Sequence, residues 1–123
     1  MSRIDHIGIA TEDIEQASKF WKLIGMKPGD DEINLEQDVK IRMFYGNNEN
    51  GENTHSKVEL IEALSENSPI AKFISKRGEG IQQLAIAVVD IDELIKNSSS
   101  SRIVLLGSTK ICLIFLELFF QNL

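Results

Sequence analysis

The sequence predicts an α+β fold in which two related strand–helix modules share one sheet. An apolar strand pattern at Ile4–Ala10 recurs at Ile81–Ala87, and an acid–Ile–acid triplet follows each copy. One polar residue occupies the same strand position in both copies, His6 in the first and Gln83 in the second. A duplicated unit implies a pseudo-symmetric molecule with a cleft between its halves, which is where ligands usually bind.

The chain is long enough for one domain with a core of its own. It has 123 residues, of which 42% are hydrophobic and 26% are charged. A chain of this size and composition is typical of a single globular domain. We expect one domain over residues 1–123, divided into module one (about 3–64), a linker helix (about 68–78) and module two (about 80–123).

Charge and cysteine content exclude some partners and favour a compartment. The net charge of −6 argues against nucleic acid and anionic membranes, which attract basic proteins. The apolar run Ile111–Phe120 is too short to span a bilayer and contains Glu117. The single cysteine, Cys112, cannot form an internal disulfide, and no signal-peptide pattern opens the sequence. We therefore expect a cytoplasmic protein that does not associate with membranes.

The first module begins with a strand and a helix. In the strand, His6 and Gly8 alternate with Ile7 and Ile9, which gives a small polar front and a bulky apolar back. Thr11 is suited to capping a helix that ends near Gly25. We expect one core beneath the sheet, formed by the backs of both repeated strands and by the apolar helix positions. Its members are Ile7, Ile9, Leu84, Ile86, Ile14, Ala17, Phe20, Trp21 and Ile24.

The rest of the first module reads as three strands, which gives the order β-α-β-β-β. Pro28–Asn34 is a turn or short strand, and Val39–Tyr45 alternates as a strand. The polar loop Gly46–Ser56 contains the turn pair Asn50-Gly51, and Lys57–Ala63 returns as a strand.

A linker helix separates the modules. Ser68 is its expected cap, Pro69 its first residue, and Gly78 closes it. The second module then has the strand that begins at Ile81 and a short helix over roughly Ile91–Asn97.

At least two more strands follow in the second module, at Arg102–Leu106 and Ile111–Phe120. Too few residues remain after the short helix for three typical strands with their turns. We therefore expect the second module to be shortened.

Four polar residues interrupt apolar strands. A carboxylate in such a strand is costly unless it is paired or binds a cation. One imidazole, two carboxylates and one amide oxygen form a plausible ligand set for a divalent ion with open water positions. The four residues are His6, Glu59, Gln83 and Glu117.

Other interpretations of single residues stay open, since no local spacing motif links the four. His6 alone is more often a satisfied core histidine than a ligand, and Gln83 alone an ordinary cross-strand hydrogen bonder. Glu59 would then face solvent and pair with Lys57 or Lys40. Glu117, with its apolar flanks, is the hardest to explain in this way.

Several segments resemble the vicinal oxygen chelate (glyoxalase/bleomycin-resistance) superfamily, which includes glyoxalase I and methylmalonyl-CoA epimerase. Ile4–Ala10 resembles the opening strand of epimerase-like members, and Glu36–Lys40 a following stretch. Val58–Leu60 resembles their fourth strand, and the block Ser68–Ile81 is the most specific to epimerases.

The resemblance implies paired βαβββ modules whose sheet forms a cupped half-barrel around one divalent metal ion, either Co, Mn, Ni, Mg or Zn. It places His6, Glu59, Gln83 and Glu117 on the metal-ligand positions. Glu117 and Glu59 are also the expected catalytic residues, because a carboxylate beside the metal moves the proton.

The sequence departs from the family pattern at two informative positions. It reads Gly80-Ile81-Gln82-Gln83 where the family typically has Gly-Ile-His-His. An amide oxygen should shift metal preference from zinc toward oxygen-loving ions and lower the affinity. Ile41 falls where some bacterial epimerases have a catalytic glutamate, which leaves the second base unassigned.

The implied function is metal-dependent epimerisation of methylmalonyl-CoA, an isomerase reaction that removes and returns the proton alpha to a thioester. The implied partner is a small acyl-CoA, with Lys72, Lys76 and Arg77 near the coenzyme A phosphates. A homodimer is expected because the cup would expose sheet edges and leave apolar strand residues such as Phe115 poorly covered. Two alternatives stay open. One is a non-catalytic or degenerate binding member of the superfamily, and the other is glyoxalase I (lactoylglutathione lyase).

Overall fold

A computed structural model of the chain describes residues 2–90, 92–93, 96, 103–106 and 111–115. Two helices and eight strands have both ends within these ranges. The strands are β1 (Ser2–Ala10), β2 (Lys27–Pro28), β3 (Glu32–Asn34), β4 (Val39–Asn47), β5 (Asn53–Ala63), β6 (Gly80–Val88), β7 (Ile103–Leu106) and β8 (Ile111–Phe115). The helices are α1 (Ile14–Leu23) and α2 (Pro69–Arg77).

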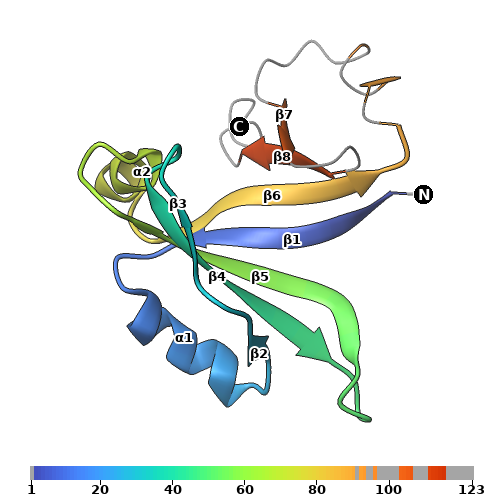
Figure 1. Cartoon of the computed structure of the whole chain (residues 1–123). Helices are drawn as coiled ribbons and strands as arrows, with labels where there is room; N and C mark the ends of the chain where they lie inside the picture. Colours follow the sequence, from blue (N-terminus) through green and yellow to red (C-terminus); the bar gives the residue numbers. More distant parts are fainter. Residues whose placement is uncertain (1, 91, 94–95, 97–102, 107–110, 116–123) are drawn as a thin grey trace.

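The strands form one open, curved sheet in the order β2-β4-β5-β1-β6-β8-β7, with β3 paired to β4 (Figure 1). β1 is the strand of module one that borders module two; it lies parallel to β5 and antiparallel to β6. The predicted α+β fold with a cupped sheet is confirmed. No helix in the described ranges is long and apolar enough to cross a membrane.

The described strands of the second module do not repeat the pairing of the first. β1 pairs in parallel with β5, the last strand of its module, whereas β6 pairs antiparallel with β8. β8 also pairs antiparallel with β7, the strand that precedes it in the sequence. Residues 92, 93 and 96 are helical, in agreement with part of the expected short helix. The other residues of that helix, and residues 116–120 of the expected final strand, lie outside the described ranges.

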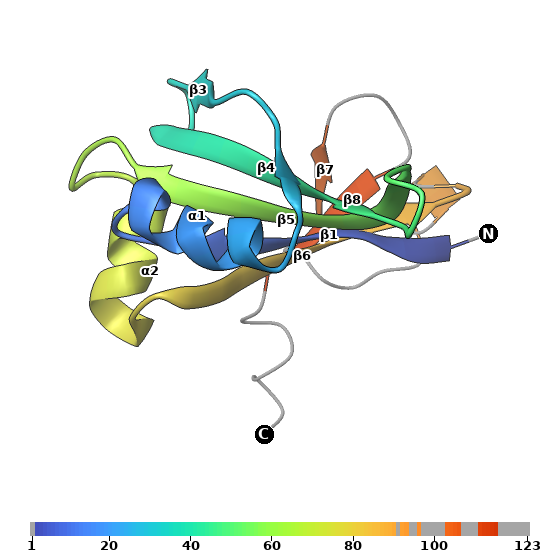
Figure 2. The ribbon, with the colours of Figure 1, turned by 90° about the horizontal axis from the view of Figure 1, so that it is seen from below.

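The two faces of the sheet carry different helices. α1 packs on one face, where Ile14 forms a buried cluster with Phe44, Val58 and Leu60, joined by Ile9, Ala17, Trp21 and Met26. α2 packs against the opposite face, where Ile70 lies with Ala10, Val39 and Ile61. Figure 2 shows α1 lying along the sheet and α2 at the end of β5 and β1. We call the face opposite α1 the inner face; it carries His6, Gly8, Ala10, Glu59 and Gln83.

The predicted core is confirmed in part. Ile9, Ile14 and Trp21 share the cluster under α1, whereas Ile7, Leu84 and Ile86 are half-buried. The prediction was wrong for two other apolar residues, in and just after the last turn of α1. Phe20 is 56% exposed and Ile24 is 54% exposed. Phe20 packs edge-on against Trp21, and Ile24 lies beyond the last helical residue.

The helix ends test the predicted caps. Ser68 caps α2, Pro69 begins it and Gly78 closes it with a φ of 80°, as predicted. The predicted Thr11 cap of α1 is wrong, since the carboxylate of Asp13 accepts the hydrogen bond from the Gln16 backbone N–H. The Thr11 hydroxyl oxygen accepts instead from the Asp13 backbone N–H at 3.2 Å, and the hydroxyl donates to Glu79 at 3.0 Å. The cap therefore moves two residues along the chain.

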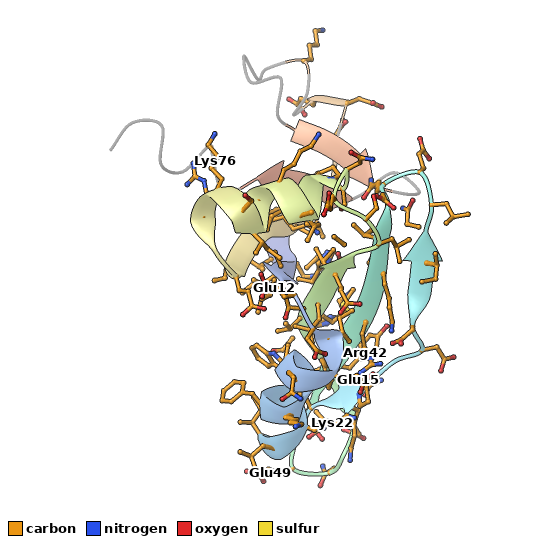
Figure 3. All side chains as sticks on the ribbon, turned by 90° about the vertical axis from the view of Figure 1, so that its left-hand side faces the viewer. Glu12, Glu15, Lys22, Arg42, Glu49 and Lys76 are labelled. Carbon is orange, nitrogen blue, oxygen red and sulfur yellow. The ribbon has the colours of Figure 1, made fainter. Side chains whose placement is uncertain are left out.

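An ion-pair network fixes α1 to the sheet. The Arg42 guanidinium, on β4, donates to both carboxylate oxygens of Asp31, at 2.6 and 2.9 Å, and to Glu15 on α1 at 2.6 Å. It also donates to the buried Ser18 hydroxyl at 3.0 Å. Figure 3 shows Glu15 and Arg42 side by side between the helix and the sheet.

Candidate metal centre

Three neighbouring strands bring three of the predicted ligands together on the inner face. His6 lies on β1, Glu59 on β5 and Gln83 on β6, and the backbone of Gly8 is in register with both Glu59 and Gln83. All three polar side chains are buried, with exposed fractions of 5%, 8% and 7%. A Cβ at Gly8 would lie 2.3 Å from Gln83 Cγ, so the absence of a side chain there makes room for Gln83.

Glu59 contacts both of the other side chains. Its Oε2 lies 3.3 Å from Nε2 of His6, and its Oε1 accepts a hydrogen bond of 3.0 Å from Nε2 of Gln83. The alternative in which Glu59 faces solvent beside Lys57 or Lys40 is wrong, because those lysines pair with Asp5 and Asp31. Glu117, the fourth predicted ligand, lies outside the described residues.

A fourth polar residue at the site, Asp5, was missed by the sequence interpretation. Its Oδ2 lies 2.9 Å from Nδ1 of His6, and its side chain is only 3% exposed. Lys57 and Arg3 approach the same carboxylate at 3.1 Å each. The available signal was an acid directly before His6 at the start of an apolar strand. A regular strand would direct the two side chains to opposite faces, which hid their contact.

The site is strongly coupled electrostatically. Burial alone would lower the pKa of His6, but hydrogen bonds to Glu59 and Asp5, and their charges, raise it above its usual value. Burial alone would raise the pKa of Asp5, but hydrogen bonds to His6 and Lys57, and their charges, lower it below its usual value. The surroundings therefore favour positive charge at His6 and negative charge at Asp5.

One observation in particular indicates that these side chains can bind a cation. Nε2 of His6 is buried without a well-aligned hydrogen-bond partner among the described residues, yet it faces a carboxylate oxygen at 3.3 Å. A lone pair and an anionic oxygen repel each other unless a proton or a metal ion lies between them. In the described ranges, no three His, Cys, Asp or Glu side chains gather as a ligand set. The third metal ligand, besides His6 and Glu59, would be the amide oxygen of Gln83.

A cavity of about 250 Å³ adjoins Glu59 on the inner face. Ile41, Met43 and Tyr45 of β4 provide its apolar wall. Asp30 and Glu32 also line it, so that three carboxylates border this space. The cavity is large enough for a small acyl group beside the Glu59 carboxylate, and its charge would repel an anion that entered alone.

A family model for the Glyoxalase/Bleomycin resistance protein/Dioxygenase superfamily matches residues 5–110. The chain belongs to this superfamily. The resemblance read from the sequence is thereby confirmed at the family level, and the matched range includes His6, Glu59 and Gln83.

Proteins of two Bacillus species are similar to this chain. The uncharacterized protein YqjC of Bacillus subtilis is 31% identical over 107 residues, which are 86% of this chain and 71% of that protein. The crystal structure of the hypothetical protein BH1468 from Bacillus halodurans is 38% identical with a TM-score of 0.70, covering 86% of this chain and 72% of the other.

A variant of the Streptomyces coelicolor methylmalonyl-CoA epimerase, in complex with 2-nitronate-propionyl-CoA, is 33% identical with a TM-score of 0.66. That match covers 84% of this chain and 75% of the other. This chain spans about half the length of the mammalian mitochondrial methylmalonyl-CoA epimerases that it also matches. The neighbours of the chain thus include methylmalonyl-CoA epimerases.

Proposed function

We propose that this protein epimerises a short-chain 2-carboxyacyl-CoA of the methylmalonyl-CoA type. The observation that carries the proposal is the meeting of buried His6, Glu59 and Gln83 on the inner face, in a chain similar to methylmalonyl-CoA epimerases. The arrangement is suited to removing a proton next to a thioester, a step that leaves negative charge on oxygen.

The residues proposed to hold a divalent ion are His6 through Nε2, Glu59, Gln83 and, from outside the described ranges, Glu117. The open Nε2 of His6 beside the Glu59 carboxylate supports this assignment. When bound there, a divalent ion supplies positive charge that offsets the charge developing on the thioester and carboxylate oxygens.

The proton transfers are assigned to the two glutamates. Glu59 borders the cavity, so its carboxylate can meet the alpha carbon of an acyl group held against Ile41 and Met43. Exchange on both faces of that carbon needs a second acid, for which we propose Glu117. The apolar wall orients the acyl methyl group and keeps water away from the reacting carbon.

The coenzyme A end of the substrate is assigned to α2. This helix packs on the inner-face side through Ile70, and its Lys72, Lys76 and Arg77 are exposed. Figure 3 shows Lys76 on the outer surface of α2. Cations at the end of the inner face are suited to meeting phosphate groups.

A metal-free binding member is the second candidate function. The observation in its favour is the hydrogen bond from Gln83 Nε2 to Glu59, which satisfies one carboxylate oxygen without any ion. In that case the inner face would hold an acyl-CoA without transforming it.

Elemental analysis of native protein, combined with deuterium wash-in at the substrate alpha carbon, tests the proposal. We expect a bound divalent ion and exchange with methylmalonyl-CoA, and no turnover of the glutathione hemithioacetal that glyoxalase I uses. Glu59→Gln and Glu117→Gln should each slow exchange by about 10²–10⁴-fold, and exposed Glu36→Gln should not. Metal-free protein that binds methylmalonyl-CoA without exchange would support the binding member, and turnover of the hemithioacetal would support glyoxalase I.

A further inference from the structure

A bulge in β1 turns Asp5 toward His6. The pairing of β1 with β6 shifts between Ile4 and His6, so Asp5 has no partner residue on β6. Neighbours in a regular strand point to opposite faces, whereas here the Asp5 carboxylate lies 2.9 Å from Nδ1 of His6. Bulges are common beside functional sites because they redirect a side chain in this way.

The contact decides which ring nitrogen of His6 carries the proton. An ionised carboxylate only accepts hydrogen bonds, so the short approach of Asp5 requires the proton on Nδ1. In the neutral ring Nε2 then carries a lone pair, and this is the atom that faces Glu59 at 3.3 Å. A metal ion needs that lone pair, and a histidine ligand usually donates its other N–H to an acceptor that holds the ring.

We infer that Asp5 is a positioning residue, which keeps the His6 proton on Nδ1 and leaves Nε2 free to bind a cation between His6 and Glu59. The inference rests on the proposed function in that a divalent cation is the occupant. Without Asp5, the remaining acceptor for the ring would be Glu59. The proton would then move to Nε2 and close the cation site.

A purely structural role for Asp5 makes a different prediction. The carboxylate also pairs with Lys57 and Arg3, and on that view its purpose is to neutralise these two cations. Lys57→Gln removes one of those pairs and keeps the contact between Asp5 and His6. Asp5→Leu removes all three contacts with a somewhat larger side chain of the same branched shape that has no acceptor.

The test reads the His6 ring directly in metal-free protein. Long-range ¹H–¹⁵N spectra, recorded at a pH where the ring is neutral, report which nitrogen is protonated. The chain has 2 histidines, so His55→Gln assigns the signals. We expect the proton on Nδ1 in wild type and Lys57→Gln, and a shift to Nε2 in Asp5→Leu.

Calorimetry with Co²⁺ alone gives the second readout. Asp5→Leu should weaken binding by about 10–100-fold. Lys57→Gln should change it by less than about fivefold, because it leaves the contact between Asp5 and His6 in place. A wild-type ring protonated on Nε2 overturns the inference, even if Asp5→Leu fails to fold. Unchanged Co²⁺ affinity in folded Asp5→Leu overturns it as well.

Experimental results that contradict the proposed function differ from those that contradict the role of Asp5. Wild-type protein with the Nδ1–H ring and bound Co²⁺, but with no exchange of methylmalonyl-CoA, would contradict the epimerase and leave the role of Asp5 standing. If wild type bound no Co²⁺, the proposed metal chemistry would fail, and the position of the ring proton would still decide the role of Asp5.

Discussion

Gly8 provides the space in which Gln83 reaches Glu59. A Cβ at this position would lie 2.3 Å from Gln83 Cγ and 2.8 Å from its Cδ and Nε2, well inside contact distance. Gly8→Ala should therefore displace Gln83 and destabilise the fold by about 1–3 kcal/mol, the usual cost of overpacking. Urea denaturation of the metal-free protein measures it. The double variant Gly8→Ala/Gln83→Ala should recover most of the loss, and strictly additive losses would contradict the steric argument.

Gln83 is the weakest member of the candidate ligand set, because an amide is a poorer ligand than imidazole for late first-row ions. Gln83→His should tighten Co²⁺ or Zn²⁺ binding roughly tenfold, or about 1.4 kcal/mol, measured by calorimetry. Gln83→Leu is the matched control, since it removes the hydrogen bond to Glu59 without adding a ligand. Equal affinities for Gln83→His and Gln83→Leu would count against a metal ion at this position.

At the scale of elements, Arg42 joins α1, β4 and the segment before β3. Arg42→Gln breaks the bidentate pair with Asp31 and the contact with buried Ser18, and should destabilise the protein by about 1.5–3 kcal/mol at pH 7. Chemical denaturation measures the loss. Lys22→Gln, at the exposed end of α1, is the control and should change stability little.

The loss of stability caused by Arg42→Gln should also depend on pH. Hydrogen bonds from Arg42 hold the pKa of Asp31 below its ordinary value of 3.8. A carboxyl with a lowered folded-state pKa stabilises the fold fully above its unfolded pKa and loses that contribution as the pH falls through the folded value. The difference between wild type and Arg42→Gln should therefore be constant near neutral pH and shrink below about pH 4. A difference that grows on acidification would refute this account.

The sequence predicted elements better where local chemistry is decisive. The sequence Ser68-Pro69 and the glycine at 78 specify the ends of α2, and the structure agrees. At α1, two candidate caps lie two residues apart. Asp13 accepts from the Gln16 backbone N–H, whereas the Thr11 hydroxyl accepts from the Asp13 backbone N–H and donates to Glu79, which is distant in sequence. The error at Phe20 has a similar cause, because helical spacing alone does not tell how wide a stripe the sheet will cover.

The candidate site was predictable only through resemblance. The meeting of His6, Glu59 and Gln83 depends on β1 lying between β5 and β6, and no local spacing indicates that order. Asp5 was missed because the β1 bulge that redirects it has no signature in the residues around it. The apolar strand pattern placed His6 and Gln83 opposite α1, and this part is confirmed.

At the scale of the whole molecule, the negative charge on the inner face favours binding of a cation. Asp30, Glu32 and Glu59 border one cavity in a chain of net charge −6. Removing metal with a chelator should therefore strongly weaken binding of methylmalonyl-CoA, because its carboxylate would lie beside the three carboxylates of this cavity without an offsetting ion. Calorimetry before and after chelation measures this, and adding back Co²⁺ should restore it. Equal binding with and without metal would contradict the prediction.

We also expect a homodimer, as predicted from the sequence. The structure adds exposed apolar residues at the end of α1, with Leu23 83% exposed, which a second copy would cover. Sedimentation at micromolar concentration measures the assembly state. A stable monomer at that concentration would contradict the prediction.

The position of β1 has a consequence for the order of folding. β1 is a central strand, and it is synthesised well before both of its neighbours, β5 and β6, which come from much later in the chain. Until residue 88 is made, β1 has no complete set of partners, and sheets closed by such distant pairings form slowly. During that time its apolar residues are exposed to other chains. Synthesis rate and chaperones should therefore affect the yield of folded protein more than the modest size of the chain suggests.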